Sequence, residues 1–159
     1  MTQTKFKKLT ADDYIWVYDV IQDETDQADV EAHLISRALD VMVEDVYDMK
    51  DPEVVDVEED VKSQVNDFNA YVLEDSGSVR VDLKHPIGDL DTIRILPPSV
   101  RDRIGNSTTN TMKRVCQEIS RICSIPEKTV RSIRIGDFSE VARARMYFRR
   151  KRDPQDSLS

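Results

Sequence analysis

The sequence predicts an α+β fold that is mostly helical, with one small β-hairpin between acidic N-terminal helices and basic C-terminal helices. Apolar residues recur at helical spacing on both sides of a short segment in which apolar and polar residues alternate strictly. The charge also divides sharply. Residues 1–100 carry 24 acidic and 9 basic side chains, whereas residues 101–159 carry 7 acidic and 14 basic ones. Such asymmetry favours a binding or assembly role over catalysis.

The length of 159 residues fits one domain of ordinary size, or a small domain with an appendage. We divide it into an acidic helical region (1–75), a hairpin with helices (76–150) and a tail (151–159) that is expected to be disordered. No apolar run approaches the roughly 20 residues that span a bilayer. The basic N-terminus lacks the apolar stretch of a signal peptide. We therefore expect a soluble cytosolic protein without membrane contact.

Three helices are expected in the acidic region. Thr10, followed by Asp12 and Asp13, favours the start of a short helix that runs through Ile21. A second helix is predicted over about 28–49. Asp51-Pro52 favours the start of the third, in which apolar residues follow at spacings of 3, 4, 4, 3 and 4: Val54, Val57, Val61, Val65, Phe68 and Val72.

This narrow stripe predicts a partner surface. Valine weakens the intrinsic helix propensity, so the helix needs another surface for its stability. That surface belongs either to another protein or to the preceding helix of the same chain. The residues assigned to partner binding are Val57, Val61, Val65 and Phe68.

The segment 79–96 is predicted to form an antiparallel hairpin. Ser76-Gly77-Ser78 indicates a turn, and the alternating runs Val79–Leu83 and Ile93–Ile95 indicate two strands. The residues between them, from His85 to Asp89, have the composition of a turn.

The last third is predicted to be helical. A broad apolar face runs from Met112 to Cys123, and Ser124-Ile-Pro-Glu127 fits a capping box for a short helix. Gly136 is expected to interrupt the chain, and Asp137 to cap a final helix. That helix is basic, and we expect it to bind acidic surface of its own chain or of a neighbour through Arg143, Arg145, Arg149 and Arg150.

No cofactor, metal or catalytic site is predicted. Cys116 and Cys123 are seven residues apart, about 10 Å along a helix axis, which is too far for a disulfide. The histidines His33 and His85 are distant in sequence, so the thiols are interpreted as structural. Phosphate-loop, dinucleotide and nucleophile-elbow motifs are absent from the sequence. We therefore expect no enzyme activity.

Residues 79 to about 148 resemble the tail-assembly chaperones of contractile-tailed bacteriophages. The family pattern of a strand and an L-x-x-P-[IV] turn matches Leu83-Lys-His-Pro-Ile87, and a second strand with a proline and a polar turn matches 93–102. A hydrophobic-Pro step after a helix matches Ile122-Cys-Ser-Ile-Pro126. The family's closing L-x-x-x-D helix is approximated by 133–138.

The resemblance covers about 70 of the 159 residues and implies a small α+β protein without an active site. It implies a partner, the long helical tape-measure protein of the tail, and a place in the host cytoplasm. Two alternatives stay open: a structural tail or baseplate component that is retained in the virion, and a nucleic-acid-binding regulatory protein. The negative net charge and the 6% aromatic content make nucleic acid the less favoured partner. Self-association stays open as well.

Overall fold

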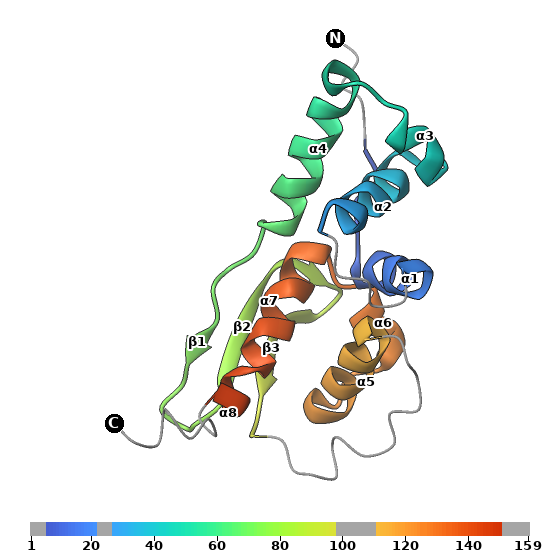
Figure 1. The fold of residues 1–159 in the computed structure, drawn as a ribbon. Helices are drawn as coiled ribbons and strands as arrows, with labels where there is room; N and C mark the ends of the chain where they lie inside the picture. The colour runs from blue at the N-terminus through green and yellow to red at the C-terminus, as the bar shows by residue number, and fades with distance from the viewer. Residues whose placement is uncertain (1–5, 22–26, 98–110, 151–159) are drawn as a thin grey trace.

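Helices surround a small antiparallel sheet, and this arrangement confirms the predicted, mostly helical α+β class. The computed structural model describes residues 6–21, 27–97 and 111–150 (Figure 1). In these ranges the elements are α1 (Ala11–Ile21), α2 (Gln27–Leu39), α3 (Val43–Tyr47), α4 (Asp51–Val65), β1 (Val72–Leu73), β2 (Val79–Ile87), β3 (Leu90–Ile95), α5 (Thr111–Cys123), α6 (Glu127–Arg131), α7 (Ile135–Arg145) and α8 (Tyr147–Arg150). In Figure 1, α2–α4 occupy one end and the sheet with α5–α8 the other, with α1 between them.

The predicted hairpin is confirmed. β2 pairs with β3 in antiparallel register, with Val79 opposite Ile95. The turn is shorter than expected, because β2 continues through Ile87 after a register shift and the chain reverses at Gly88, whose φ is 56°. A two-residue strand, β1, adds a third strand beside β2 that the sequence did not predict.

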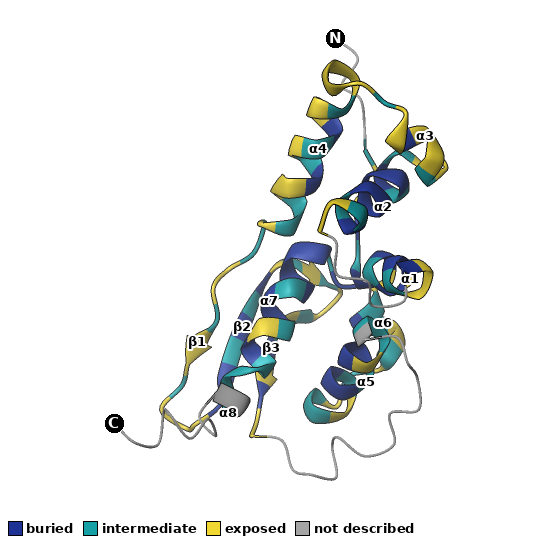
Figure 2. Ribbon diagram, in the orientation of Figure 1, coloured by how far each residue is buried: buried dark blue, intermediate teal, exposed yellow. Residues whose placement is uncertain are grey.

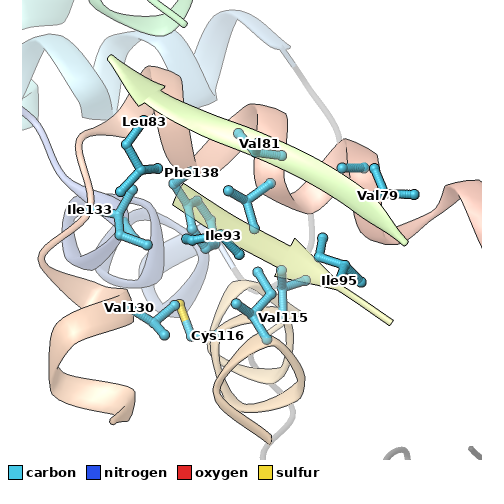
Figure 3. Packing of buried hydrophobic residues seen from close by; sticks show 14 of the residues in the cluster. Val79, Val81, Leu83, Ile93, Ile95, Val115, Cys116, Val130, Ile133 and Phe138 are labelled. Carbon is cyan, nitrogen blue, oxygen red and sulfur yellow. The ribbon is translucent and has the colours of Figure 1, made fainter. Parts of the chain in front are cut away.

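One apolar cluster fills the space between the sheet and the C-terminal helices. Alternate residues of β2 and β3 are buried, as strand periodicity requires. Figure 3 shows their side chains together with Phe138 of α7 and with Val115 and Cys116 of α5. α1 adds Ala11 and Ile15 to this cluster, so the sheet core extends into the acidic region.

A second cluster lies between α1, α2 and α4. Its most buried members include Val17 of α1, Leu34 of α2 and the α4 residues Val57 and Val61. Ile135, the first residue of α7, completes it from the C-terminal half.

Two helices of the acidic region are shorter than predicted. The helix expected over 28–49 is divided, because Asp40 adopts a left-handed conformation with φ of 56° and Met42 is extended before α3 begins. Aspartate tolerates this region better than most residues. The third helix ends at Val65, so Phe68 follows the helix and Val72 belongs to β1.

Two predictions about the starts of the C-terminal helices are also wrong. Ser124 has a φ of 54°, and α6 begins after Pro126 without a side-chain cap, so the predicted capping box does not form. Asp137 is buried within the first turn of α7, and its carboxylate accepts the backbone N–H groups of Lys84 and His85, each at 3.0 Å. It therefore caps the irregular part of β2.

Gly136 does not interrupt the chain but lies inside α7 at the crossing with α4. A Cβ atom there would lie 2.4 Å from the carbonyl oxygen of Asp67 and 2.5 Å from that of Gln64. Glycine therefore permits a close approach of α7 to the end of α4 that any side chain would prevent.

The N-terminal segment joins the two halves. The backbone N–H of Ala11 donates to the oxygen of Ile133 at 2.8 Å, and that of Ile135 donates to the oxygen of Leu9 at 3.0 Å. The Gln64 side chain accepts from the Leu9 N–H at 2.7 Å and donates to the Lys7 oxygen at 3.0 Å. α4, α7 and the N-terminal segment are thus fixed to one another.

Candidate functional site

An open groove of about 680 Å³ lies where α1 meets the connection between α2 and α3. It is lined by residues of all three helices and by the three residues that connect α2 to α3. These are Trp16, Val20, His33, Ser36, Arg37, Asp40, Val41, Met42, Val43, Glu44 and Asp45.

Large apolar side chains are exposed in this groove. The exposed fractions are 38% for Trp16, 50% for Val20, 39% for Val41 and 69% for Met42. Figure 2 shows exposed residues over α3, beside the buried interior of α2. Single exposed apolar residues are common on soluble proteins, but a group that lines one concave surface indicates a binding site.

Local structure accounts for this exposure. From Tyr14 to Ile21, Asp19 is the one polar side chain, so α1 is apolar nearly all round and one neighbouring core covers only part of it. Val17 and Ile21 are buried, and Trp16 and Val20 remain outside.

The break after α2 supplies the other wall of the groove. Asp40 turns the chain out of the helix, and Val41 and Met42 lie on the surface before α3 starts. Two hydrogen bonds to Ser36 hold the break in place: the Val41 N–H donates to the Ser36 carbonyl oxygen at 3.1 Å, and the Ser36 hydroxyl donates to the Val41 carbonyl oxygen at 2.5 Å.

Two side chains of α2 contact the Trp16 ring. The guanidinium of Arg37 lies 4.8 Å from the ring centroid, and the His33 ring centroid lies 6.2 Å away. Arg37 is fixed in turn by Asp13, whose Oδ1 accepts from its Nε at 2.9 Å. The His33 Nδ1 donates to the Asp29 oxygen at 2.8 Å. Trp16 therefore gives the groove an aromatic side chain that contacts Arg37 and His33 of α2.

Asp13 pairs with two cations, Arg37 of the groove and Lys7, each 2.9 Å from its Oδ1. Burial raises the pKa of the Asp13 carboxyl, but hydrogen bonds from the Thr10 N–H, Lys7 and Arg37 outweigh burial and leave that pKa below its ordinary value. The carboxylate is thus charged at neutral pH.

The remaining charges of the lining are acidic. Asp40, Glu44 and Asp45 are exposed at its edge, and no ion pair between described residues involves their carboxylates. The groove is therefore lined by exposed apolar side chains together with exposed carboxylates.

The predicted valine stripe lies elsewhere. Val57 and Val61 are 1% and 2% exposed and pack in the cluster between α2 and α4, so within this chain they are not available to a partner. This is the alternative in which the stripe packs on the preceding helix. Val65 is half-buried, and Phe68 is half-buried with the Arg143 guanidinium 5.7 Å from its ring centroid.

The arginines of the basic helix pair within their own half of the chain. Arg143 Nε lies 2.9 Å from a carboxylate oxygen of Glu140, and Arg145 pairs with Glu118. Both glutamates are buried. Arg149 and Arg150 belong to α8, but their side chains lie outside the described part of the structure. Neither Arg143 nor Arg145 lines the groove.

Both cysteines belong to α5 and are free thiols, Cys116 buried and Cys123 half-buried. Burial raises the pKa of each thiol to about 12, so both are protonated at neutral pH. Within the described ranges, histidine, cysteine and acidic side chains form no group of three or more that could hold a metal ion. None of the helices that the structure describes has the length and apolarity that a bilayer crossing requires.

Sequence reasoning missed the groove, although one signal was present. A helix with apolar residues on every side must leave some of them outside its own core, and the run Val41-Met42-Val43 is apolar without alternation. Comparison of the chain with family models, with curated proteins and with solved structures gives no match.

Proposed function

We propose that this chain is a phage tail-assembly chaperone that binds the tape-measure protein through the groove beside Trp16 while the tail is being built. The observation that carries the proposal is the concave set of exposed apolar side chains Trp16, Val20, Val41 and Met42. An assembly chaperone must cover apolar stripes of its client reversibly, and a preformed apolar groove on a highly charged protein suits that task. The sequence resemblance over residues 79–148 supports the same function.

The site does not favour nucleic acid as the partner. Arg143 and Arg145 neutralise buried glutamates, and Arg131 pairs with Asp12 at 2.6 Å. Cations that already compensate carboxylates contribute less to phosphate binding.

Co-expression tests the proposal. The tape-measure protein of the same genome is produced alone, with the wild-type chain, and with the Met42→Asp variant. We expect more soluble tape-measure protein with the wild-type chain, and a loss of this effect with Met42→Asp. The matched control is Leu96→Asp, since Leu96 is also an exposed apolar residue, at 57%, but lies beyond the end of β3 and outside the groove.

Mass spectrometry of purified virions separates the chaperone from the structural alternative. A chaperone is made with the tail proteins but is absent from finished particles. Stoichiometric presence in the virion would replace this proposal by a structural tail or baseplate role.

A further inference from the structure

We propose that the groove beside Trp16 selects an amphipathic helix whose apolar stripe is flanked by lysine or arginine. This inference rests on the proposed function, because it states the chemistry of the client segment that the groove receives.

Charge complementarity gives the sign of the partner. Three carboxylates line the groove, those of Asp40, Glu44 and Asp45, against one cation, Arg37, which is paired with Asp13. A segment with acidic flanks would meet these carboxylates with like charge, whereas basic flanks would be attracted and oriented. The exposed apolar side chains then supply affinity through burial of the client's own apolar side chains.

Backbone pairing favours a helix over an extended segment. An added strand needs free N–H and C=O groups along an edge, and the one extended stretch of the lining offers few. The N–H and C=O of Val41 both bond to Ser36, and the Met42 oxygen accepts from the N–H groups of Asp45 and Val46. A helix satisfies its own backbone and presents only side chains, so it matches a surface that offers only side chains.

A second copy of this chain is a poorer occupant. Among the described helices of more than two turns, the one with a net positive charge is α5, which carries Lys113, Arg114 and Arg121 against one acid, and its apolar side chains are buried in the sheet cluster. That helix cannot present an apolar stripe to a neighbour while the chain is folded.

The chain carries its own probe for this test, since Trp16 is its single tryptophan and lies in the groove. The ligand is a synthetic helical peptide of about five turns, with leucines on one stripe and lysines on both sides of it. A matched peptide keeps the leucines and replaces each lysine by glutamate. Binding is followed by Trp16 emission and by acrylamide quenching.

We expect the basic peptide to move Trp16 emission to shorter wavelength and to protect the ring from acrylamide, with an affinity that falls as salt is added. The acidic peptide should bind about tenfold more weakly at low salt, which corresponds to about 1.4 kcal/mol. Equal affinity for both peptides, or preference for the acidic one, would overturn the inference.

Charge reversal provides the matched pair of variants. The double variant Glu44→Lys with Asp45→Lys should reverse the preference between the two peptides. The control, Glu53→Lys with Asp56→Lys, changes the net charge equally at exposed positions of α4 outside the groove, and should keep the wild-type preference. Reversal in both variants would attribute selectivity to net charge and would overturn the groove as its source. Far-UV circular dichroism confirms that each variant is folded.

Two further outcomes separate this inference from its alternatives. If Trp16 is protected from acrylamide before peptide is added, and Met42→Asp both exposes it and converts a dimer to a monomer, the groove is a self-association surface and the inference fails. If the peptides behave as expected but co-expression does not solubilise the tape-measure protein, the proposed function fails and the basic-helix selectivity stands for a different client.

Discussion

The acidic helices and the hairpin-containing half use their charges in opposite ways. In the C-terminal half, buried carboxylates have assigned partners: Glu118 pairs with Arg145, Glu140 with Arg143, and Asp137 with two backbone N–H groups of β2. In the acidic half, Asp13 is buried and paired, whereas the carboxylates around the groove face solvent. Charge in the first case fixes the fold, and in the second it remains exposed, where the proposed partner would meet it.

Apolar side chains differ between the halves in the same direction. The inward residues of β2 and β3 are covered by α5 and α7, while α1 and the α2–α3 connection leave Trp16, Val20 and Met42 exposed. The comparison teaches that a net charge by itself does not identify the binding surface. Arg143 and Arg145 of the basic helix pair internally, and the proposed recognition surface lies on the half of opposite sign.

The largest expected effect tests whether the basic helix is structural. Arg145→Ala should lower the free energy of unfolding by about 3 kcal/mol, because the buried Glu118 loses its charged partner. Arg143→Ala should cost less than about 1 kcal/mol, since its side chain is 56% exposed and Glu140 keeps the Tyr71 N–H at 2.8 Å. Urea denaturation followed by circular dichroism measures both. Equal losses would remove the distinction between a buried and a surface arginine in this helix.

The next effect tests the junction between the two halves. Gly136→Ala should destabilise the protein by about 2 kcal/mol or more, because the new Cβ would overlap backbone oxygens of α4 and the residues after it. Gly88→Ala is the control: it has open space around it and a φ of 56°, and should cost about 1 kcal/mol from backbone strain alone. A smaller loss for Gly136→Ala than for Gly88→Ala would contradict the close crossing of α7 on α4.

Regular periodicity made the hairpin and the main helices predictable. The alternation from Val79 to Leu83 reports which side chains face the core, and the structure buries that same set. In the same way, the apolar face of α5 predicts that Cys116 is a buried structural thiol, and Cys116 is buried.

Features that depend on one residue's backbone conformation or on its contacts with distant residues were not predictable. Asp40 ends a helix by a local conformation that its neighbours do not signal, and Gly136 is explained by Gln64 and Asp67, about 70 residues away in sequence. The sequence predicts that Asp137 caps a helix, yet its carboxylate accepts two backbone N–H groups of β2 instead.

The candidate site was hidden for a related reason. Periodicity shows which residues can share a face, but whether another element covers that face depends on the tertiary arrangement. Val57 and Val61 were covered, and Trp16 and Met42 were not.

A third effect concerns the stability of the protein at acid pH, to which Asp13, the partner of Arg37, contributes. Asp13 has a lowered pKa in the folded chain, so it contributes stability above its unfolded value of 3.8, and this contribution is lost as the pH falls through the folded pKa. Wild-type stability should therefore decline below about pH 4. Asp13→Asn should lower stability at pH 7 by about 1–2 kcal/mol and make that decline shallower.

Asp67 supplies the comparison for this measurement. Hydrogen bonds from His85 and Lys84 also lower the pKa of its carboxyl, but its side chain is 33% exposed, so solvent screens the effect. Asp67→Asn should change the acid limb less than Asp13→Asn does. The reverse order would place the acid-sensitive contact at Asp67, beside β2, instead of at Asp13.

The smallest expected effect on stability tests whether the groove is free surface. The double variant Val41→Ser with Met42→Ser should change the free energy of unfolding by no more than about 0.5 kcal/mol, because both side chains are exposed. Val46→Ser, a few residues further on in α3, should cost about 2 kcal/mol, because Val46 is 7% exposed and packs in the second cluster. Urea denaturation measures all three proteins under one condition. A double variant as unstable as Val46→Ser would show that Val41 and Met42 hold α3 in place, whereas an unchanged stability combined with lost peptide binding assigns their exposure to recognition.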